Sequence, residues 1–392
     1  MTLRYAFFVA LLVASIATPR AIAQEDYAKY RVLDTKVIQN MWAGPGQSAA
    51  LLSLDGSRLL HLSNRSPDMC LYAPAQIGSW VELACSDYTN DNRPGEAQDM
   101  FWSPAGDKLL MPTRHDAFAR FRDTDIRIFD ADTFTVQNLT DDGFDGTLLD
   151  GKGPAELDVF AHWFDDNSIV FVRHSVPPGG TQQDTSTSLM TIAADGGEPV
   201  KLLDIPSSSN FPVWNLTVSP DSKLLAYSFE DRGDAENDGI YLLTLGTTTP
   251  TRVAKMSELD GMRLLGLAFS ADSKFLLLLG ETGDGRNTAR VLDVTTGDIV
   301  LVDANQNVTG VAWSPTGSAL AYTTLDPSKP ETPGGLFLAP APGRPARLLI
   351  GEAFYPPVCC GNEPFIWATN DTLVLPRLAD SLGSVLYIQL GE

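Results

Sequence analysis

The hydrophobic residues between positions 308 and 350 fall into four short runs, at 311–313, 319–323, 336–339 and 346–350. The segments between these runs are polar and rich in Pro, Gly and Asp. Short apolar runs bounded by turn residues are typical of β-strands joined by hairpins. This part of the chain is therefore predicted to form one four-stranded antiparallel sheet.

The turn between the first two runs belongs to a motif that returns seven times along the chain. It reads apolar-Ser-Pro-(Asp/Thr/Ala)-(Gly/Ser) and is followed by another apolar run, as at 313–317. Its second position is occupied by Ser53, Ser103, Phe164, Ser219, Ser270, Ser314 and Ala368. Repeats of roughly 50 residues built from short strands are typical of β-propellers. We therefore predict an all-β protein, a single seven-bladed β-propeller of four-stranded antiparallel blades.

A large apolar residue stands before most of these turns. In four copies it is a tryptophan: Trp102, Trp163, Trp313 and Trp367. Because each blade must cover its neighbours, we expect these rings to pack between blades and not to form a ligand platform.

The last repeat shows three apolar runs only, at 365–367, 372–375 and 385–388. A three-stranded blade would leave an open sheet edge. The segment 30–37, near the start of the chain, has strand character and belongs to no repeat. We predict that it pairs with 385–388 and closes the ring, and that its removal destabilises the protein far more than the removal of 24–28.

The recurring motif resembles the TolB-type, WD40-like (PD40-type) β-propeller repeat, whose signature is close to Trp-Ser-Pro-Asp-Gly followed by an apolar strand. The copies at 102–106, 218–222, 269–273 and 313–317 carry the resemblance best. It extends over roughly 30–392. Little more than one strand precedes the first repeat, so the resemblance implies a TolB-like propeller without TolB's N-terminal α/β domain.

The N-terminal segment 1–23 is predicted to be a secretory signal peptide, which leaves 24–392 as one propeller domain. Arg4 supplies a positive charge, the apolar run 6–17 is too short to span a bilayer, and small residues precede Gln24. We therefore expect an exported protein, periplasmic or secreted, without membrane insertion. The net charge of −21 argues against nucleic acid and anionic lipid as partners, and a monomer is expected.

The chain has four cysteines, an even number for an oxidising compartment. Cys70 and Cys85 flank a predicted hairpin, and a register in which paired residue numbers sum to 155 places them opposite each other. A disulfide between them is predicted. Cys359 and Cys360 are adjacent and could close a vicinal disulfide that stiffens the segment 356–361, either as a plain structural element or as part of a binding site.

The long connections between strands are expected to lie on one face of the ring, which marks that face as the functional one. One of them carries Asp231, Asp234 and Asp238, whose oxygens could bind Ca²⁺ or form a solvated acidic loop. No cofactor other than this possible Ca²⁺ is expected. Another connection is cationic, with Arg114, His115, Arg120, Arg122 and Arg127, and could contact an anion or pair with neighbouring aspartates.

No catalytic motif is found: the chain lacks Gly-x-Ser-x-Gly, His-Glu-x-x-His and a P-loop. No catalytic residue is therefore assigned. The interpretation favoured by the sequence is a non-catalytic binding module that recognises a protein, peptide or envelope component on the long-loop face. The alternatives are an extracellular or periplasmic enzyme acting on a carbohydrate or other polar substrate, and a structural role in an envelope assembly.

Overall fold

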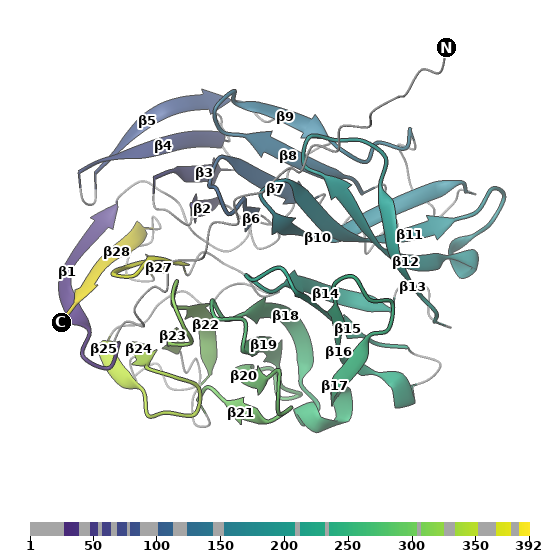
Figure 1. The fold of residues 1–392 in the computed structure, drawn as a ribbon. Helices are drawn as coiled ribbons and strands as arrows, with labels where there is room; N and C mark the ends of the chain where they lie inside the picture. Colours follow the sequence, from purple (N-terminus) through teal and green to yellow (C-terminus); the bar gives the residue numbers. More distant parts are fainter. Residues whose placement is uncertain are drawn as a thin grey trace, which may run out of the picture.

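The structure is a computed structural model that describes residues 27–38, 48–53, 57–63, 69–76, 79–86, 101–112, 124–143, 153–207, 212–231, 235–303, 307–324, 334–351, 366–377 and 384–392. These residues form seven four-stranded antiparallel sheets arranged in a ring (Figure 1). The predicted all-β, seven-bladed propeller is confirmed.

Blades 1 to 6 are each built from four strands that are consecutive in the chain. Their bounds are β2 (Ser48–Leu52), β3 (Leu59–Ser63), β4 (Met69–Gln76), β5 (Ser79–Ser86); β6 (Phe101–Trp102), β7 (Lys108–Pro112), β8 (Ile126–Asp130), β9 (Thr135–Asn138); β10 (Ala155–Asp165), β11 (Ser168–Val176), β12 (Ser186–Ala193), β13 (Val200–Ile205); β14 (Val213–Val218), β15 (Leu224–Phe229), β16 (Gly239–Thr244), β17 (Thr251–Lys255); β18 (Arg263–Phe269), β19 (Phe275–Glu281), β20 (Asn287–Asp293), β21 (Ile299–Leu301); and β22 (Val308–Trp313), β23 (Leu320–Thr324), β24 (Gly335–Ala339), β25 (Arg347–Ile350). Within the described residues, the helical segments are the short 3-10 turns η2 (Gln182–Asp184), η3 (Ala235–Asn237) and η4 (Met256–Leu259).

Blade 7 is assembled from both ends of the chain. It contains β26 (Ile366–Thr369), β27 (Thr372–Arg377), β28 (Ser384–Gly391) and, as its fourth strand, the N-terminal β1 (Arg31–Ile38). Thr35 lies opposite Ile388 and Val37 opposite Leu386. Figure 1 shows β1, in purple, beside the yellow β28. The prediction that the N-terminal strand closes the ring against 385–388 is confirmed.

The closure begins before β1. Tyr27 is only 3% exposed, and its ring centroid lies 4.8 Å from that of Trp367 in an edge-to-face contact. Its hydroxyl lies 2.9 Å from Thr316 Oγ1 in the first turn of blade 6. Tyr27 therefore belongs to the core between blades 6 and 7. That the removal of 30–37 destabilises the protein far more than the removal of 24–28 stays a prediction.

The recurring serine is a buried part of the turn that joins the first and second strands of a blade. Its hydroxyl accepts a hydrogen bond from the backbone N–H five residues later, where the second strand begins. The bonds measure 2.9 Å at Ser53, 3.1 Å at Ser103, 2.9 Å at Ser219 and 3.0 Å at Ser270. Because a buried N–H without a partner is costly, the position requires a small side chain that can accept a hydrogen bond.

The fifth motif position needs a left-handed backbone, which glycine adopts without strain. Gly106 and Gly317 have φ of 75° and 77°, whereas Ser222 and Ser273 have φ of 55° and 59°. The two serines form bonds between blades that glycine could not. Ser222 Oγ donates to the Phe164 carbonyl at 2.8 Å, and Ser273 Oγ accepts from the Asp221 N–H at 3.3 Å.

The motif tryptophans lie between blades, as expected. Trp102, Trp163 and Trp367 are buried, and Trp313 is half-buried against the apolar cluster between blades 5 and 6. Trp163 Nε1 donates to the Phe101 carbonyl of blade 2 at 2.7 Å, and Trp313 Nε1 donates to the Ala268 carbonyl of blade 5 at 3.0 Å. Trp163 and Trp313 therefore fill a seam and also fix the position of one blade relative to its neighbour.

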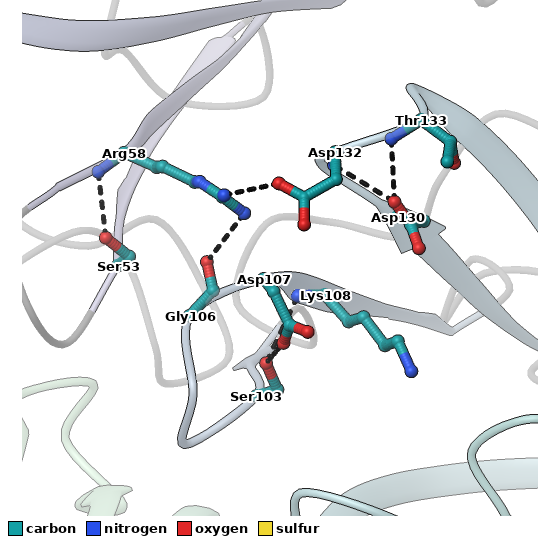
Figure 2. Close-up of polar contacts among 9 residues, drawn as sticks. All are labelled: Ser53, Arg58, Ser103, Gly106, Asp107, Lys108, Asp130, Asp132 and Thr133. Carbon is teal, nitrogen blue, oxygen red and sulfur yellow. Dashed lines mark hydrogen bonds and ion pairs between the residues drawn. The ribbon is translucent and has the colours of Figure 1, made fainter.

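The seam between blades 1 and 2 contains a charged side chain in addition to Trp102. Figure 2 shows Arg58, from the first turn of blade 1, reaching the turns of blade 2. Its Nη1 donates to the Gly106 carbonyl at 3.3 Å, and its Nη2 pairs with Asp132. Asp130 closes the turn that carries Asp132 by accepting the Thr133 N–H at 2.8 Å.

Replacing Tyr27 by alanine is expected to lower the free energy of unfolding by about 3 kcal/mol, because the change removes a buried ring from the closing seam. Urea unfolding of the chain from residue 24 onward measures this difference. The exposed neighbour Ala28 provides the control, and Ala28→Ser should change stability by less than about 0.5 kcal/mol. Equal stability of the two variants would show that the ring closes without Tyr27.

Candidate functional site

The two faces of the ring differ in how their connections are built. On one face, short turns join first to second and third to fourth strands, and their side chains bond to the turn itself or to the turn of a neighbouring blade. In the turn after β20, Asp293 Oδ1 accepts the N–H groups of Thr295 and Thr296 at 2.8 and 3.0 Å. The other face carries the longer connections, such as the η2 segment between β11 and β12. We call it the long-loop face.

A buried ion pair lies at the long-loop end of the seam between blades 2 and 3. Arg173, near the end of β11, donates from Nε to Asp158 Oδ1 at 2.8 Å and from Nη2 to Oδ2 at 2.7 Å. Asp158 is 1% exposed and Arg173 is 9% exposed. The third guanidinium nitrogen, Nη1, forms an ion pair with the partly exposed Glu156. Both oxygens of the buried carboxylate are therefore occupied by one arginine.

Burial raises the pKa of Asp158 to about 6, although the hydrogen bonds and charge of Arg173 favour the ionised form. A raised carboxyl pKa is a feature of general acids. However, Asp158 is enclosed and bonded through both oxygens, so it cannot transfer a proton to a substrate without breaking the pair. Asp158 and Arg173 both belong to blade 3, so the pair fixes the start of β10 to the end of β11.

Blade 2 contributes a second buried carboxylate to this seam. Asp125, at the start of β8, accepts from Asn138 Nδ2 at 2.7 Å and from Arg127 Nη2 at 3.4 Å. Burial raises its pKa as well. The backbone N–H of Asp158 donates to the Thr124 carbonyl at 2.9 Å, which joins β10 directly to the strand that carries Asp125.

The loop that enters blade 3 is tied to the same cluster. Asp142 Oδ2 accepts the Glu156 N–H at 2.9 Å, so the exposed end of the connection is anchored to β10. The charged groups at the seam therefore form a rigid base from which the exposed loops of this face extend. We call Asp125, Asp158, Arg173, Glu156 and Asp142 the seam cluster.

Two histidines lie in blade 3 near this seam. His174 is fully buried, with Nδ1 2.9 Å from Thr187 Oγ1, and burial lowers its pKa to about 3. His162 packs against Phe101 with ring centroids 4.8 Å apart, and burial lowers its pKa too. His162 Nε2 lies 3.4 Å from Thr217 Oγ1 of blade 4. Both imidazoles are therefore neutral near pH 7 and contribute to packing.

The predicted Ca²⁺ candidates are brought together only in part. The Asp231 N–H donates to Asp238 Oδ1 at 2.6 Å, and Ser207 Oγ donates to Asp231 Oδ2 at 2.9 Å. Asp234 lies outside the described residues. Asp238 thus accepts a bond that closes its own loop, whereas Asp231 accepts one from the connection that follows β13.

Several other sequence predictions fall outside the described residues: the signal peptide at 1–23, the cationic residues Arg114, His115, Arg120 and Arg122, and the adjacent Cys359 and Cys360. Arg127 can be placed, and it pairs with Asp125 at 3.4 Å, which supports the ion-pair alternative at that position.

The predicted disulfide between Cys70 and Cys85 is present, with Cα atoms 4.1 Å apart. Within the described part of the chain, the side chains of Cys70, Glu82 and Cys85 are the one group of three possible metal donors that lie close together. In the oxidised protein both sulfurs belong to the disulfide and neither is a thiolate ligand.

The pairing of Asp158 with Arg173 was not predicted from the sequence. Counted back from the turn at 166–167, in which Asp165 lies opposite Ser168, an unbroken ladder would place Arg173 opposite Phe160. Register shifts after Val159 and after Trp163 move it to Asp158. A bulge leaves little trace in the hydrophobic pattern, so the pair becomes evident only in three dimensions.

Comparisons with known proteins identify the fold. No protein-family model matches the sequence, and no curated protein matches it. Among solved structures, an oligogalacturonate lyase in complex with manganese matches with 13% identity over 93% of this chain and 98% of the other, at a TM-score of 0.59. The oligogalacturonate lyase of Vibrio parahaemolyticus matches with 11% identity over 92% and 97%, at a TM-score of 0.57.

TolB from Acinetobacter baumannii also matches, with 16% identity over 78% of this chain and 64% of the other, at a TM-score of 0.42. Identities this low establish the likeness of fold and nothing about the site. The chain is a seven-bladed β-propeller. In the part that the structure describes, we find no helix with the length and apolar character needed to cross a membrane.

The pH dependence of stability should report the burial of His174. Folding lowers its pKa from 6.5 to about 3, so the unfolded chain takes up a proton that the folded chain does not, and stability falls as the pH drops below 6.5. Between pH 7.5 and pH 5 this loss amounts to about 2 kcal/mol. In urea unfolding over the same pH interval, the free energy of unfolding of His174→Gln should fall by about 2 kcal/mol less than that of the parent protein. Identical losses in both proteins would contradict a buried neutral imidazole.

The seam cluster predicts unequal effects for its two central residues. Arg173→Met leaves Asp158 buried without its cation and should lower the free energy of unfolding by about 3–5 kcal/mol at pH 8. Asp158→Asn leaves Arg173 paired with Glu156 and should cost about 1 kcal/mol.

The loss of stability caused by Arg173→Met should also be smaller at pH 5. Arg173 lowers the pKa of the buried Asp158, so without it the pKa rises further and protonation stabilises the variant more than the parent as the pH falls. Denaturant titrations of the parent and the two variants at pH 8 and pH 5 measure the stability cost of each substitution and how that cost changes with pH. A larger cost for Asp158→Asn than for Arg173→Met would show that the cluster is organised differently.

Proposed function

We propose that this protein is an exported, TolB-like propeller that binds a protein, peptide or envelope component through its long-loop face. The observation that carries the proposal is the contrast between the faces. One face has short turns whose polar groups bond within the turn, as at Asp293, or to the turn of the next blade, as at Ser273, whereas the other face carries the longer connections. Variable loops on a rigid scaffold are the usual arrangement for recognition.

The chemistry of the described residues supports binding over catalysis. Asp158 is enclosed by Arg173, and His174 is fully buried and neutral, so neither is positioned to meet a substrate. The disulfide between Cys70 and Cys85 supports export to an oxidising compartment. The net charge of −21 supports a partner that is neither nucleic acid nor anionic lipid.

The second candidate is an enzyme acting on a carbohydrate or other polar substrate. It is favoured by the similarity in fold to an oligogalacturonate lyase in complex with manganese. We favour the enzyme less than the binding module. Among the described residues, the group of possible metal donors is Cys70, Glu82 and Cys85, and its two sulfurs form a disulfide.

Binding should be tested with the exported chain, 24–392, as bait against an envelope extract of its own source. The loops at 177–185 and 235–238 are each shortened in separate variants, and Thr296→Ala with Asp298→Ala on the opposite face serves as the control. We expect at least one loop variant to weaken capture about tenfold, which corresponds to about 1.4 kcal/mol, and the control to bind as the unaltered protein does.

Capture that survives both loop changes but is lost in the control would move the binding face to the short turns. Breakdown of oligogalacturonate by the protein with manganese, followed by ultraviolet absorbance of an unsaturated product, would favour the enzyme instead.

Cys359→Ser with Cys360→Ser is expected to weaken capture while leaving thermal unfolding unchanged, because a stiffened loop loses less entropy on binding.

A further inference from the structure

Blade 1 carries a row of metal-binding side-chain types across three strands. His61 on β3 lies opposite Cys70 on β4, and Cys70 lies opposite Cys85 on β5. Residues that face each other in a ladder project their side chains to the same side of the sheet. The row therefore shares one face of the blade. Met69 and Leu71 pack on the other face, against Trp102 of blade 2.

A shift in register adds a carboxylate to this row. Cys70 pairs with Cys85, but two residues further along β4 Tyr72 pairs with Glu82 instead of Leu83. The extra residue in β5 turns Glu82 to the face of the cysteines. The Tyr72 hydroxyl donates to Glu82 Oε2 at 3.5 Å, and its pKa is raised by burial and by the nearby carboxylate.

The three donors are close enough to hold one ion. One side-chain donor atom from each of Cys70, Glu82 and Cys85 lies within 4.8 Å of the others. Cys70 is buried, Cys85 half-buried and Glu82 exposed, so a cation and a reductant can approach from the Glu82 side. The disulfide occupies the two sulfurs as long as it is intact.

We propose that reduction of the disulfide between Cys70 and Cys85 converts this part of blade 1 into a Zn²⁺ site, with the two thiolates and the Glu82 carboxylate as protein ligands and water in the fourth position. Thiolates with a carboxylate are ligands for a borderline cation such as Zn²⁺, whereas Ca²⁺ prefers oxygen alone. The site is closed to metal in the oxidised protein and opened by reduction.

The chemical steps balance with a dithiol as the reductant. The dithiol gives two electrons and two protons to the S–S bond and becomes a disulfide, which leaves thiols at Cys70 and Cys85. Zn²⁺ then displaces the two thiol protons to solvent. Tetrahedral bonds of about 2.3 Å require the sulfurs to stand roughly 3.8 Å apart. Rotation of the two side chains reaches this separation from Cα atoms that are 4.1 Å apart.

The bound ion would replace the covalent link between β4 and β5. The three ligands carry three negative charges in their metal-binding forms, and Zn²⁺ neutralises two of them. Blade 1 would thus keep its fourth strand fastened in either redox state, by a disulfide when oxidised and by a metal when reduced.

The test uses the exported chain with Cys359→Ser and Cys360→Ser, which removes the other cysteines. The protein is reduced with a phosphine and titrated with Co²⁺, whose thiolate charge-transfer and visible bands report tetrahedral sulfur ligation, and Co²⁺ is then displaced by Zn²⁺. We expect one equivalent bound by the reduced protein and none by the oxidised protein. Adding Cys70→Ser and Cys85→Ser should abolish binding, and Glu82→Gln should weaken it at least tenfold.

Glu198→Gln on an exposed turn of blade 3 is the matched control and should bind as tightly as the parent. Thermal unfolding is followed in parallel: Zn²⁺ should raise the Tm of the reduced parent, or restore its folding if reduction unfolds it, and should leave the serine variant unchanged. The proposal is overturned if the reduced protein neither binds Co²⁺ nor gains stability from Zn²⁺. It is also overturned if Glu82→Gln binds as tightly as Glu198→Gln.

Discussion

A propeller blade has two apolar faces, and each can be buried only by a neighbouring blade. Phe129 of blade 2 packs with Leu60 of blade 1, and Ile126 of blade 2 packs with Trp163 of blade 3. Apolar clusters likewise join blades 3 and 4, 4 and 5, 5 and 6, and 6 and 7, so each of these blades buries a face against the next. The pairing of β1 with β28 is therefore the interaction on which the remaining structure depends. It supplies the fourth strand of blade 7 and brings Tyr27 into the last seam.

Apolar packing alone would let blades slide past one another, because the hydrophobic effect has no direction. Polar bonds at the seams supply that direction. Indole N–H groups of Trp163 and Trp313 and hydroxyls of Ser222 and Ser273 each join one blade to its neighbour through a backbone group or a turn. On the long-loop side, the backbone N–H of Asp158 has the same role between blades 3 and 2, because it donates to the Thr124 carbonyl. A ring fixed in this way can carry long loops without deforming, which is why the proposed binding face lies there.

Much of this architecture could be predicted from the sequence because it depends on repetition. The spacing of the serine turns gave seven blades, and the unassigned segment 30–37 indicated how the ring closes. The pairing of Cys70 with Cys85 could be predicted because the hairpin between them restores its register at that pair. Each of these predictions used only the regular alternation of strands and turns.

The missed features arise where that regularity is broken. Two register shifts in β10 bring Asp158 to Arg173, and one in blade 1 brings Glu82 to the cysteines. A shift changes the face of every residue beyond it, so a count along the strand gives the wrong neighbour. Tyr27 was missed for another reason: its partners Trp367 and Thr316 are near the other end of the chain.

Native-state hydrogen exchange tests most directly whether ring closure supports the whole structure. If it does, the bonded amides of β1 and β28 exchange only through global unfolding, with the same free energy as the core amides of β10 and β18. Exchange of β1 through a local opening, at a free energy several kcal/mol below that of the other blades, would show that the remaining ring stands without its N-terminal strand and would contradict this account.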